Sequence, residues 1–531
     1  MPTDCISFRD TNYFSSFICD YLDESPELKV FYNRFPKLEN FKYHIEEKTS
    51  SYDKSVREVL TNQLEQQYQH IETSELTLQN IESIRSENTF TITTGHQLNL
   101  FTGPLYFLYK IISTINLTKA LKTEYPDYNF VPVYWMASED HDFDEINYFN
   151  FRGKKIQWNR EDGGAVGRFD TEGLDDILNI ISAEFGEGRN AKQLMRWFKE
   201  AYINHNNLSD ATRYLANALF SEYGLVIIDA DDRELKRLFI PQMQKELLEL
   251  TSYTTVKETN NKIEALGLNI QVYPRAINLF YLGKNLRERI LFEDGIFKVN
   301  NTAISWTKNE LLKHLDEKPE CFSPNVILRP LYQEVILPNL CYIGGGGEMA
   351  YWFQLKSNFE AQNVTVPILL LRNSVLIKTE KQANKQENLG ISNTDLFLKR
   401  NSYINKRVRK ISNIDIDFSE QLEYLQQQFS ALNELANKTD KSFLGAVEAQ
   451  EKKQIKGLKH LEKRLLKAQK KKLADQIARA TELQEQLFPN NSLQERNTNF
   501  SELYLEFGET LIPELINSLE PLKGEFTIIT M

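Results

Sequence analysis

Three separated stretches of the chain carry residue types that can do chemistry. The first, TTGHQLNLFTGPLYFLYK at residues 93–110, places glycines and a histidine between a β-like run and a helix predicted to begin at Pro104. The free N–H groups and the dipole of a helix start favour anions, so we expect a phosphate or carboxylate near Gly95 and Thr102–Gly103. The alternative is that these glycines only shape a turn. The candidate binding residues of this stretch are Thr94, Gly95, His96, Gln97, Thr102 and Gly103.

The second stretch, WMASEDHDFDEIN at residues 135–147, gathers carboxylates around one histidine. One or two carboxylates are ordinary at a helix start, and Asp142 or Asp144 could do no more than cap one. The larger number indicates a general base, a site that recognises an amine, or binding of Mg²⁺ or another divalent ion. No HExxH or similar spacing is present, so no protein-held metal site is predicted. We take Asp140, His141 and Asp142 as catalytic candidates and Glu139 as a binding candidate.

The third stretch, LCYIGGGGEMAYW at residues 340–352, has the order strand, glycine run, helix, which lets the backbone approach a ligand closely. It is not a Walker A loop, and Met349 stands where GxGxxG needs its third glycine, so the run does not by itself specify a nucleotide. Cys341 is interpreted as a small buried hydrophobe rather than a nucleophile. The candidate binding residues are Gly345, Gly346, Gly347, Glu348 and Tyr351.

The elements around these stretches predict an α/β fold. Apolar, β-branched runs at TFTITTG, FVPVYWM, LVIID, NLCYIG and VPILLL alternate with helical periodicity, which is typical of a doubly wound parallel sheet. In such a sheet, ligands bind outside the carboxyl ends of the strands. All three stretches follow predicted strands, so we expect them to meet in one cleft.

The chain is predicted to contain four regions. Residues 1–87 form an N-terminal helical region that packs on the core, and residues 88–379 form the core. Inserts interrupt the core at about 148–205 and 240–325, and the second contains an antiparallel meander that turns at Asp294 and Gly295. Residues 380–488 form a coiled-coil arm, and residues 489–531 return to the core.

The predicted arm is a long antiparallel helical hairpin that stops at Pro489. Apolar residues recur at three and four positions, as in a coiled coil, and include Leu458, Leu461, Leu465 and Ile477. This seam exposes more apolar surface than one return helix covers, so a homodimer is expected. The alternative is a monomer whose hairpin folds back on its own core. The lysines of the arm, such as those at 470–472, are interpreted as a solvated face rather than an RNA-binding stripe.

Composition restricts the class of protein. With 41% hydrophobic and 26% charged residues, the 531-residue chain is typical of a globular protein with two or three structural units. A net charge of −11 disfavours a dedicated nucleic-acid binder. The four cysteines show no CxxC spacing, which fits a reducing compartment. The chain start has no signal-peptide pattern, and no apolar run approaches the roughly 20 residues that span a bilayer, so we expect a cytoplasmic protein without a membrane partner.

The residues of these motifs, and their order along the chain, resemble the signature blocks of the bacillithiol biosynthesis cysteine-adding enzyme family. The similar blocks include the three stretches above, together with LLLRNS and FPNNSLQER, and they spread over residues 91–496. The resemblance implies a Rossmann-like core with two connecting inserts, similar to class I aminoacyl-tRNA synthetases, and a coiled-coil arm that pairs two chains. The two further blocks add the binding candidates Arg372, Asn373, Ser374 and Arg496.

The resemblance implies a ligase that joins L-cysteine to glucosaminyl malate through an amide bond. A carboxylate is a poor acyl donor, so activation by ATP or another nucleotide is expected, with Mg²⁺ as a candidate ion. Asp140, His141 or Asp142 could take the amine proton, and His96 occupies a slot reminiscent of the synthetases' phosphate-binding histidine. Two other interpretations compete: a synthetase-like nucleotide- or RNA-binding protein without ligase activity, and a coiled-coil scaffold with a degenerate Rossmann core.

Overall fold

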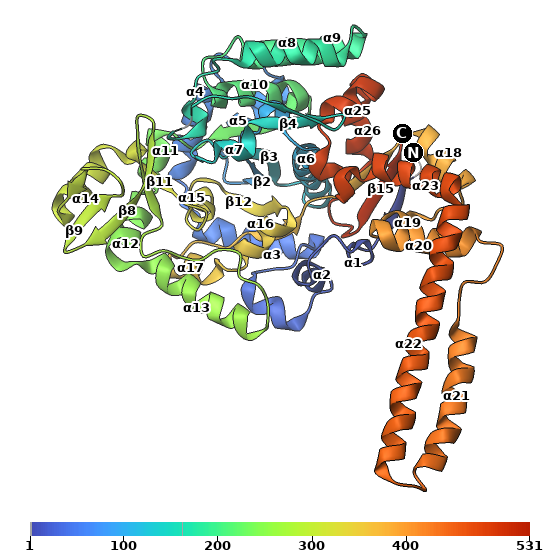
Figure 1. Ribbon diagram of the computed structural model, residues 1–531. Coiled ribbons are helices and arrows are strands. Elements are labelled where there is room, and N and C mark those ends of the chain that lie inside the picture. The colour runs from blue at the N-terminus through green and yellow to red at the C-terminus, as the bar shows by residue number, and fades with distance from the viewer. Residues whose placement is uncertain (1–2, 162) are drawn as a thin grey trace. The chain divides into compact units, whose positions relative to one another are not determined.

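The computed structural model describes residues 3–161 and 163–531 and divides into two compact units (Figure 1). The core unit comprises Met1–Ile377 and Leu493–Met531, and the arm unit comprises Lys378–Ser492. The first two residues of the predicted N-terminal region and Asp162 of the first predicted insert lie outside the described residues. Among the described residues, no helix combines the length and the apolar character needed to cross a bilayer.

The centre of the core unit is a five-stranded sheet of spatial order β13-β12-β2-β3-β6, in which every neighbouring pair is parallel. The strands are β2 (Thr89–His96), β3 (Asn129–Met136), β6 (Val226–Asp229), β12 (Asn339–Gly344) and β13 (Ile368–Leu371). The chain fills the sheet outward from β2 in one direction and from β12 in the other. The strand order therefore reverses between β2 and β12, where open α/β sheets bind ligands. The predicted doubly wound parallel sheet is confirmed.

Burial explains why these segments are strands. All eight residues of β2 are buried, and only the first residue of β3 is exposed, so both strands have protein on both faces. The crossover helix α6 (Tyr106–Glu124) joins them, and its Leu117 and Leu121 belong to one cluster with Phe90 and Leu340. Each such fully buried side chain contributes about 1.5–3 kcal/mol. The helix begins two residues after Pro104, the predicted start.

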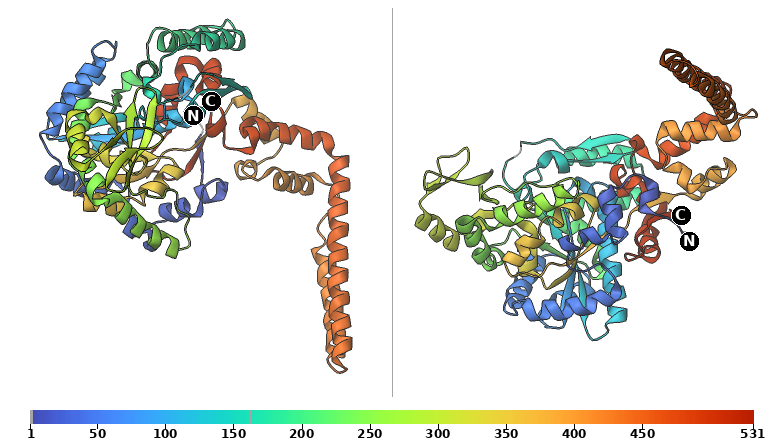
Figure 2. Two further views of the ribbon diagram at one scale, coloured as in Figure 1. Left: turned by 60° about the vertical axis from the view of Figure 1, so that its left-hand side comes forward. Right: turned by 90° about the horizontal axis from the view of Figure 1, so that it is seen from below.

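The N-terminal region consists mainly of helices that pack on this sheet (Figure 2). Lys48 of α3 forms a buried ion pair with Glu334 (3.0 Å), and the Tyr21 hydroxyl of α2 donates to the carbonyl oxygen of Leu369 (2.6 Å). The elements are β1 (Thr3–Ile6), α1 (Phe8–Thr11), α2 (Ser16–Leu22), the 3₁₀ helix η1 (Pro26–Phe31), α3 (Leu38–Ser51), α4 (Val56–Tyr68) and α5 (Glu75–Ser83).

Between β3 and β6 the chain forms a small antiparallel hairpin and three longer helices. These elements are α7 (Phe143–Ile146), β4 (Tyr148–Phe151), β5 (Lys154–Gln157), the 3₁₀ helix η3 (Val166–Arg168), α8 (Leu174–Phe185), α9 (Arg189–Tyr202) and α10 (Leu208–Phe220). Strands β4 and β5 pair antiparallel, and helices α8 and α9 contact each other.

Between β6 and β12 the chain forms helices and an antiparallel sheet of order β10-β9-β8-β7-β11. The elements are α11 (Arg233–Leu238), α12 (Ile240–Glu249), α13 (Thr251–Ala265), β7 (Leu279–Gly283), β8 (Leu286–Glu293), β9 (Ile296–Val299), β10 (Ser305–Trp306), α14 (Lys308–Glu317), β11 (Phe322–Pro324) and α15 (Arg329–Ile336). The predicted meander and its turn are confirmed, because Asp294 and Gly295 join β8 to β9 and both have positive φ. Two successive positive φ values are the signature of a type I′ hairpin turn.

The turn at Asp294 and Gly295 is expected to contribute to the stability of the core unit through the positive φ of Gly295. Gly295 has φ +79° and open space where a Cβ would stand, so Gly295→Ala adds backbone strain without a clash. We expect the free energy of unfolding of the core unit to fall by about 1–2 kcal/mol, the left-handed penalty of an L-residue. Chemical denaturation followed by tryptophan fluorescence measures the change. Gly295→Asn is the control, because asparagine tolerates this conformation better; equal losses in both variants would contradict the explanation.

The remaining core elements follow β12 or close the chain. They are α16 (Gly346–Trp352), α17 (Lys356–Ala361), β14 (Val375–Lys378), α24 (Gln494–Asn497), α25 (Phe500–Phe507), α26 (Leu511–Ser518) and β15 (Phe526–Thr530). Strands β1, β15 and β14 form a separate three-stranded sheet in which β1 and β15 are antiparallel. The C-terminal segment therefore belongs to the same unit as the parallel sheet.

The arm unit is helical. Its helices are α18 (Glu380–Asn388), α19 (Asn393–Leu396), α20 (Arg400–Ile411), α21 (Ser419–Ala436), α22 (Lys441–Lys472) and α23 (Ala474–Leu487). Helices α21 and α22 lie side by side (Figures 1 and 2), with Phe429, Ala436 and Val447 in a small buried cluster. Because α21 is shorter than α22, Leu461 remains 53% exposed. The antiparallel helical pair is as predicted, but the seam continues beyond the part of α22 that α21 covers.

Candidate active site

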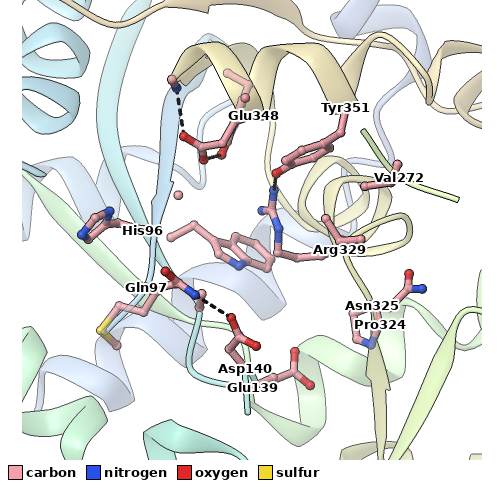
Figure 3. A pocket seen from close by; sticks show the side chains of 18 of the residues that line it. His96, Gln97, Glu139, Asp140, Val272, Pro324, Asn325, Arg329, Glu348 and Tyr351 are labelled. Atoms are coloured by element: carbon pink, nitrogen blue, oxygen red, sulfur yellow. Dashed lines mark hydrogen bonds between the residues drawn. The ribbon is translucent and has the colours of Figure 1, made fainter. Parts of the chain in front are cut away.

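The three stretches meet at one cavity of about 660 Å³. It lies beside the reversal of strand order, and its wall includes residues that follow β2, β3 and β12. The predicted site residues that line it are Gly95, His96, Gln97, Glu139, Asp140, His141, Gly345, Gly346, Gly347, Glu348, Tyr351, Arg372 and Arg496. Figure 3 shows Glu139 and Asp140 on one side of the pocket and Glu348 on the other.

The end of β2 brings backbone and a neutral imidazole to the cavity. A Cβ on Gly95 would stand 3.1 Å from the Tyr342 hydroxyl and 3.7 Å from Nη1 of Arg329, so a glycine leaves room for both side chains. Burial lowers the pKa of His96 well below its ordinary value, and the charge of Lys110 adds to the effect. His96 is therefore neutral at physiological pH and offers hydrogen bonds rather than positive charge.

Thr102 and Gly103 are buried in the turn before α6 and are not part of the cavity wall. Phe101, Thr102 and Gly103 all have positive φ. The Asn499 side-chain amide donates to the carbonyl oxygens of Phe101 (2.8 Å) and Gly103 (2.6 Å), which holds this strained turn. A Cβ on Gly103 would lie 2.7 Å from that of Asn99, so the glycine is sterically required. The turn at Thr102–Gly103, where an anion was predicted, therefore faces protein and not the cavity.

Thr94, Asn373 and Ser374 also lie behind the cavity wall. The Thr94 hydroxyl donates to the carbonyl oxygen of Ile343 (2.8 Å) and so links β2 to β12. Asn373 accepts a hydrogen bond from Ser113 of α6 (2.8 Å). Ser374 donates to Glu495 (3.3 Å). These side chains hold strands and loops in place instead of facing the cavity.

Glu348 is the most strongly held carboxylate of the cavity. It accepts hydrogen bonds from the Tyr342 hydroxyl (2.8 Å) and the Gly345 amide (2.9 Å), and it pairs with the buried Lys110 ammonium (2.6 Å). Lys110 also donates to the carbonyl oxygen of Gly95 (2.7 Å). Although burial acts to raise the pKa of Glu348, the charge of Lys110 and these hydrogen bonds lower it. Lys110 and Glu348 therefore join the first and third stretches across the strand reversal.

On the other side, Asp140 and His141 form a partly exposed pair. Asp140 accepts from the Gln97 amide (3.1 Å) and from the His141 backbone N–H (2.8 Å). Burial acts to raise the pKa of Asp140, but the hydrogen bonds from His141 and Gln97 and the charge of Arg287 together lower it. Nδ1 of His141 lies 2.7 Å from the Arg287 guanidinium.

Asp142 is exposed at the start of α7, makes no side-chain capping bond there, and is outside the cavity wall.

Glu139 is buried and paired with a lysine from another element. Its Oε1 lies 2.7 Å from Nζ of Lys236 on α11. The same ammonium contacts Asp231 at 2.8 Å, and Asp231 accepts two hydrogen bonds from Arg168 (2.6 and 2.8 Å). Burial raises the pKa of Glu139 above its ordinary value, and Lys236 opposes this shift without cancelling it.

Cationic side chains outnumber carboxylates on the cavity wall. Six cationic residues and three carboxylates line the cavity, so its local charge is positive although the whole chain carries −11. Arg372 is neutralised by a buried, two-point pair with Glu495 (2.7 and 3.1 Å). Four others have no carboxylate within ion-pair distance anywhere in residues 3–161 and 163–531: Arg275, Arg287, Arg329 and Arg496. Such a wall focuses anions into the cavity.

Sequence reasoning missed several of these residues. Lys110 stood in the first quoted stretch, and a lysine inside an otherwise apolar helix is a usable signal, because buried lysines need a partner. Arg287 and Arg329 carried no such signal. Arg287 projects from β8, and Arg329 donates to Gln333 (3.2 Å) and to the Tyr351 hydroxyl (3.1 Å, Figure 3).

In the described part of the chain, no group of three or more His, Cys, Asp or Glu residues is arranged to hold a metal ion.

Two family models agree with this architecture. Residues 1–373 match the family model "Bacillithiol biosynthesis BshC, N-terminal Rossmann-like domain", and residues 375–531 match the corresponding "C-terminal coiled-coil domain". A solved structure described as a "putative arginyl t-RNA synthetase" from Campylobacter jejuni aligns over 87% of this chain and 96% of its own, at 10% identity and a TM-score of 0.21. A TM-score this low does not define a fold, so the fold assignment rests on the sheet order and the family models.

Curated relatives cover the whole chain. A protein of Flavobacterium johnsoniae named "Putative cysteine ligase BshC" is 61% identical over all of both chains. A protein of the same name from Christiangramia forsetii is 59% identical over all of this chain and 99% of its own, and one from Staphylococcus saprophyticus is 30% identical over 95% and 96%. The chain therefore belongs to the BshC family, the ligases of bacillithiol biosynthesis.

Proposed function

We propose that this protein forms an amide bond between the carboxyl group of L-cysteine and the amine of glucosaminyl malate, after a nucleotide has activated the carboxyl group. The observation that carries the proposal is the single cavity at the strand reversal, with unpaired arginines on its wall and two carboxylates together on one side. The names of the relatives support cysteine as one substrate.

The arginines suit the anionic parts of the reactants. Glucosaminyl malate carries carboxylates, cysteine carries one, and a nucleotide carries phosphates. A guanidinium recognises both groups with two parallel hydrogen bonds, which a single ammonium cannot do. The region predicted as the second insert supplies Arg275 and Arg287, whereas no residue of 148–205 lines the cavity in the part of the chain that the structure describes. We therefore propose that the second insert binds substrate and that the first one supports the core.

The carboxylates suit the amine. Glu139 and Asp140 lie together on one side of the pocket (Figure 3), where an ammonium group would find opposite charge. The positive remainder of the cavity would hold the activated carboxyl group and its phosphate. This separation would place nucleophile and electrophile next to each other in one cavity, which is what an amide-forming site needs.

A product assay tests the proposal. Purified protein is incubated with L-cysteine, glucosaminyl malate, Mg²⁺ and each nucleoside triphosphate in turn, and the amide product is sought by mass spectrometry. We expect product with one nucleotide, and formation of a nucleoside mono- or diphosphate identifies the activated intermediate. Reactions without glucosaminyl malate are the control. Absence of product with every nucleotide would contradict the proposal, and a salt-dependent affinity for RNA would then favour a synthetase-like binding protein.

We also propose that the arm unit pairs two chains. Large apolar side chains stay exposed along α21 and α22, among them Tyr424 (67%), Leu435 (53%) and Leu461 (53%). Several large apolar side chains left exposed on one pair of helices favour association with another protein surface. A second copy of the same helices would bury them symmetrically, as isologous dimer interfaces do.

Sedimentation equilibrium measures the pairing. We expect a species of twice 62.0 kDa at micromolar concentration. Leu461→Glu should raise the dissociation constant at least about tenfold, because each chain loses a buried leucine worth about 1.5–3 kcal/mol and gains a charge. Lys459→Gln is the matched control, because the exposed Lys459 lies two residues before Leu461 and therefore on nearly the opposite side of α22, and it should leave the constant unchanged. A single 62.0 kDa species for the unmodified protein would rule out the dimer.

A further inference from the structure

We propose that Glu139 is the catalytic base that takes the proton from the attacking amine, and that Lys236 is the positioning residue that holds its carboxylate at the cavity wall. The assignment rests on the proposed function, and it selects one group from the three carboxylates that line the cavity. The geometry of each carboxylate decides between them.

Glu348 is occupied. The Tyr342 hydroxyl, the Gly345 amide and the Lys110 ammonium all donate to it, at 2.6–2.9 Å. A proton on this carboxyl group would displace at least one of these donors in a buried site, where an unmet donor costs about 1–3 kcal/mol. Glu348 is therefore a structural link between α6 and α16 and a poor proton acceptor.

Asp140 and Nδ1 of His141 already accept hydrogen bonds that a proton on either group would disrupt. Asp140 already accepts from Gln97 and from the His141 backbone. Although burial acts to raise the pKa of Asp140, the interactions with His141, Gln97 and Arg287 lower it. His141 presents Nδ1 to the permanently charged Arg287 at 2.7 Å, so that nitrogen acts as an acceptor toward the guanidinium. Its lone pair is thus occupied.

Glu139 combines access to the cavity with an unfilled hydrogen-bonding capacity. Its carboxylate can accept about four hydrogen bonds, and within residues 3–161 and 163–531 its only donor contact is Lys236, at 2.7 Å. Lys236 is shared with Asp231, which also holds Arg168, so the ammonium is fixed by a second carboxylate. A shared cation fixes the position of Glu139 while leaving it more basic than Asp140, in line with the raised pKa of Glu139.

Charged and titratable groups from several elements set this environment. Besides the carboxylate of Asp140 next to it, the groups that act on Glu139 or lie against its pair are Lys236 of α11, Asp231 before α11, Arg168 of η3, Arg287 of β8 and Tyr332 of α15. Lys236 and Arg287 favour the carboxylate, whereas burial and Asp231 favour the protonated acid. Burial and Asp231 outweigh the two cations, so the pKa of Glu139 lies above its ordinary value and the carboxylate accepts a proton more readily than Asp140 does.

The ammonium form of the glucosamine nitrogen transfers one proton to Glu139 and becomes a free amine. Its lone pair attacks the carbonyl carbon of a cysteinyl phosphate-type mixed anhydride, so a C–N bond forms. The bond between the carbonyl carbon and the oxygen that carries the phosphorus then breaks. The electron pair of this bond leaves with the phosphate group that came from the nucleotide. The second proton of the nitrogen leaves to solvent, and Glu139 releases its own proton before the next turnover.

The pH dependence of kcat in matched variants tests the assignment. We expect Glu139→Gln to lower kcat about 10²- to 10⁴-fold, the usual range for general-base catalysis, with little change in KM. Glu139→Asp keeps a carboxylate and should recover part of the rate. Lys236→Met removes the neighbouring cation and should move the acid limb of kcat to higher pH, because the base must be deprotonated to work. Glu258→Gln, at an exposed ion pair with Lys262, is the control and should change nothing.

Each outcome has a definite meaning. Thermal unfolding shows whether the variants fold, and Glu139→Asp carries the test if Glu139→Gln does not. Wild-type product formation together with an unchanged rate and pH profile in Glu139→Gln overturns the base assignment alone. An unmoved acid limb in folded Lys236→Met overturns the positioning role. Absence of product from the wild type with every nucleotide overturns the proposed function, and this role with it.

Discussion

Replacing Lys110 by methionine is expected to lower the free energy of unfolding of the core unit by about 3–5 kcal/mol. The substitution removes the ammonium that lies 2.6 Å from Glu348 and 2.7 Å from the carbonyl oxygen of Gly95. Methionine has a similar volume, so the loss comes from a buried carboxylate left without its cation. All five tryptophans lie in the core unit, so fluorescence during urea unfolding reports on this unit alone.

The stability that Lys110→Met removes depends on pH through the ionisation of Glu348. In the wild type the pKa of Glu348 is lowered, because Lys110 and the hydrogen bonds outweigh burial, so its stabilisation is present above the unfolded pKa and is lost as pH falls. Without Lys110, burial dominates and raises the pKa of Glu348. The destabilisation of Lys110→Met should therefore be largest near pH 8 and shrink toward pH 5, as the carboxyl group takes a proton.

Two further variants act as controls. Lys110→Met combined with Glu348→Gln removes both charges and should recover most of the lost stability, since a neutral pair needs no desolvated ion. Lys262→Met breaks an exposed pair with Glu258 and should change stability by no more than about 0.5 kcal/mol. A loss below about 1 kcal/mol in Lys110→Met would show that the pair does not hold the site together.

Replacing Arg329 by glutamine is expected to raise KM for the anionic substrate about 10²- to 10³-fold, which corresponds to the loss of a buried, charge-assisted contact. The Arg329 guanidinium lies 5.7 Å from the Tyr342 ring centre and donates to the Tyr351 hydroxyl and to Gln333. These neutral partners orient it and leave its charge unpaired toward the cavity. Glutamine keeps a polar group there but removes the charge.

Steady-state kinetics with each substrate varied separately identifies the anion that Arg329 holds. A rise in KM for glucosaminyl malate alone assigns it to the malate carboxylates, and a rise for the nucleotide alone assigns it to phosphate. Arg237→Gln is the matched control, because Arg237 forms a surface pair with Glu234 and lies outside the cavity wall. Unchanged KM values for all three substrates in Arg329→Gln would remove this arginine from substrate binding.

The sequence alone determined the parallel sheet, because strands buried on both faces leave continuous apolar runs such as FVPVYWM, and helices between them repeat at three and four. It also determined that residues near Gly95, Asp140 and Gly346 meet, since parallel strands place all their carboxyl ends at one edge. The turn at Asp294–Gly295 was equally readable, because few residue pairs accept two positive φ values.

The tertiary structure decided which side chains of those loops face the cavity. Thr102 and Gly103 were natural anion ligands in sequence, yet Asn499, nearly 400 residues away, holds their turn against protein. Arg329 and Arg287 reach the cavity from α15 and β8, and Glu139 owes its environment to Lys236 on α11. Local periodicity depends on neighbours along the chain, whereas the ionisation and orientation of a side chain depend on neighbours in space. Only the folded chain brings those partners together.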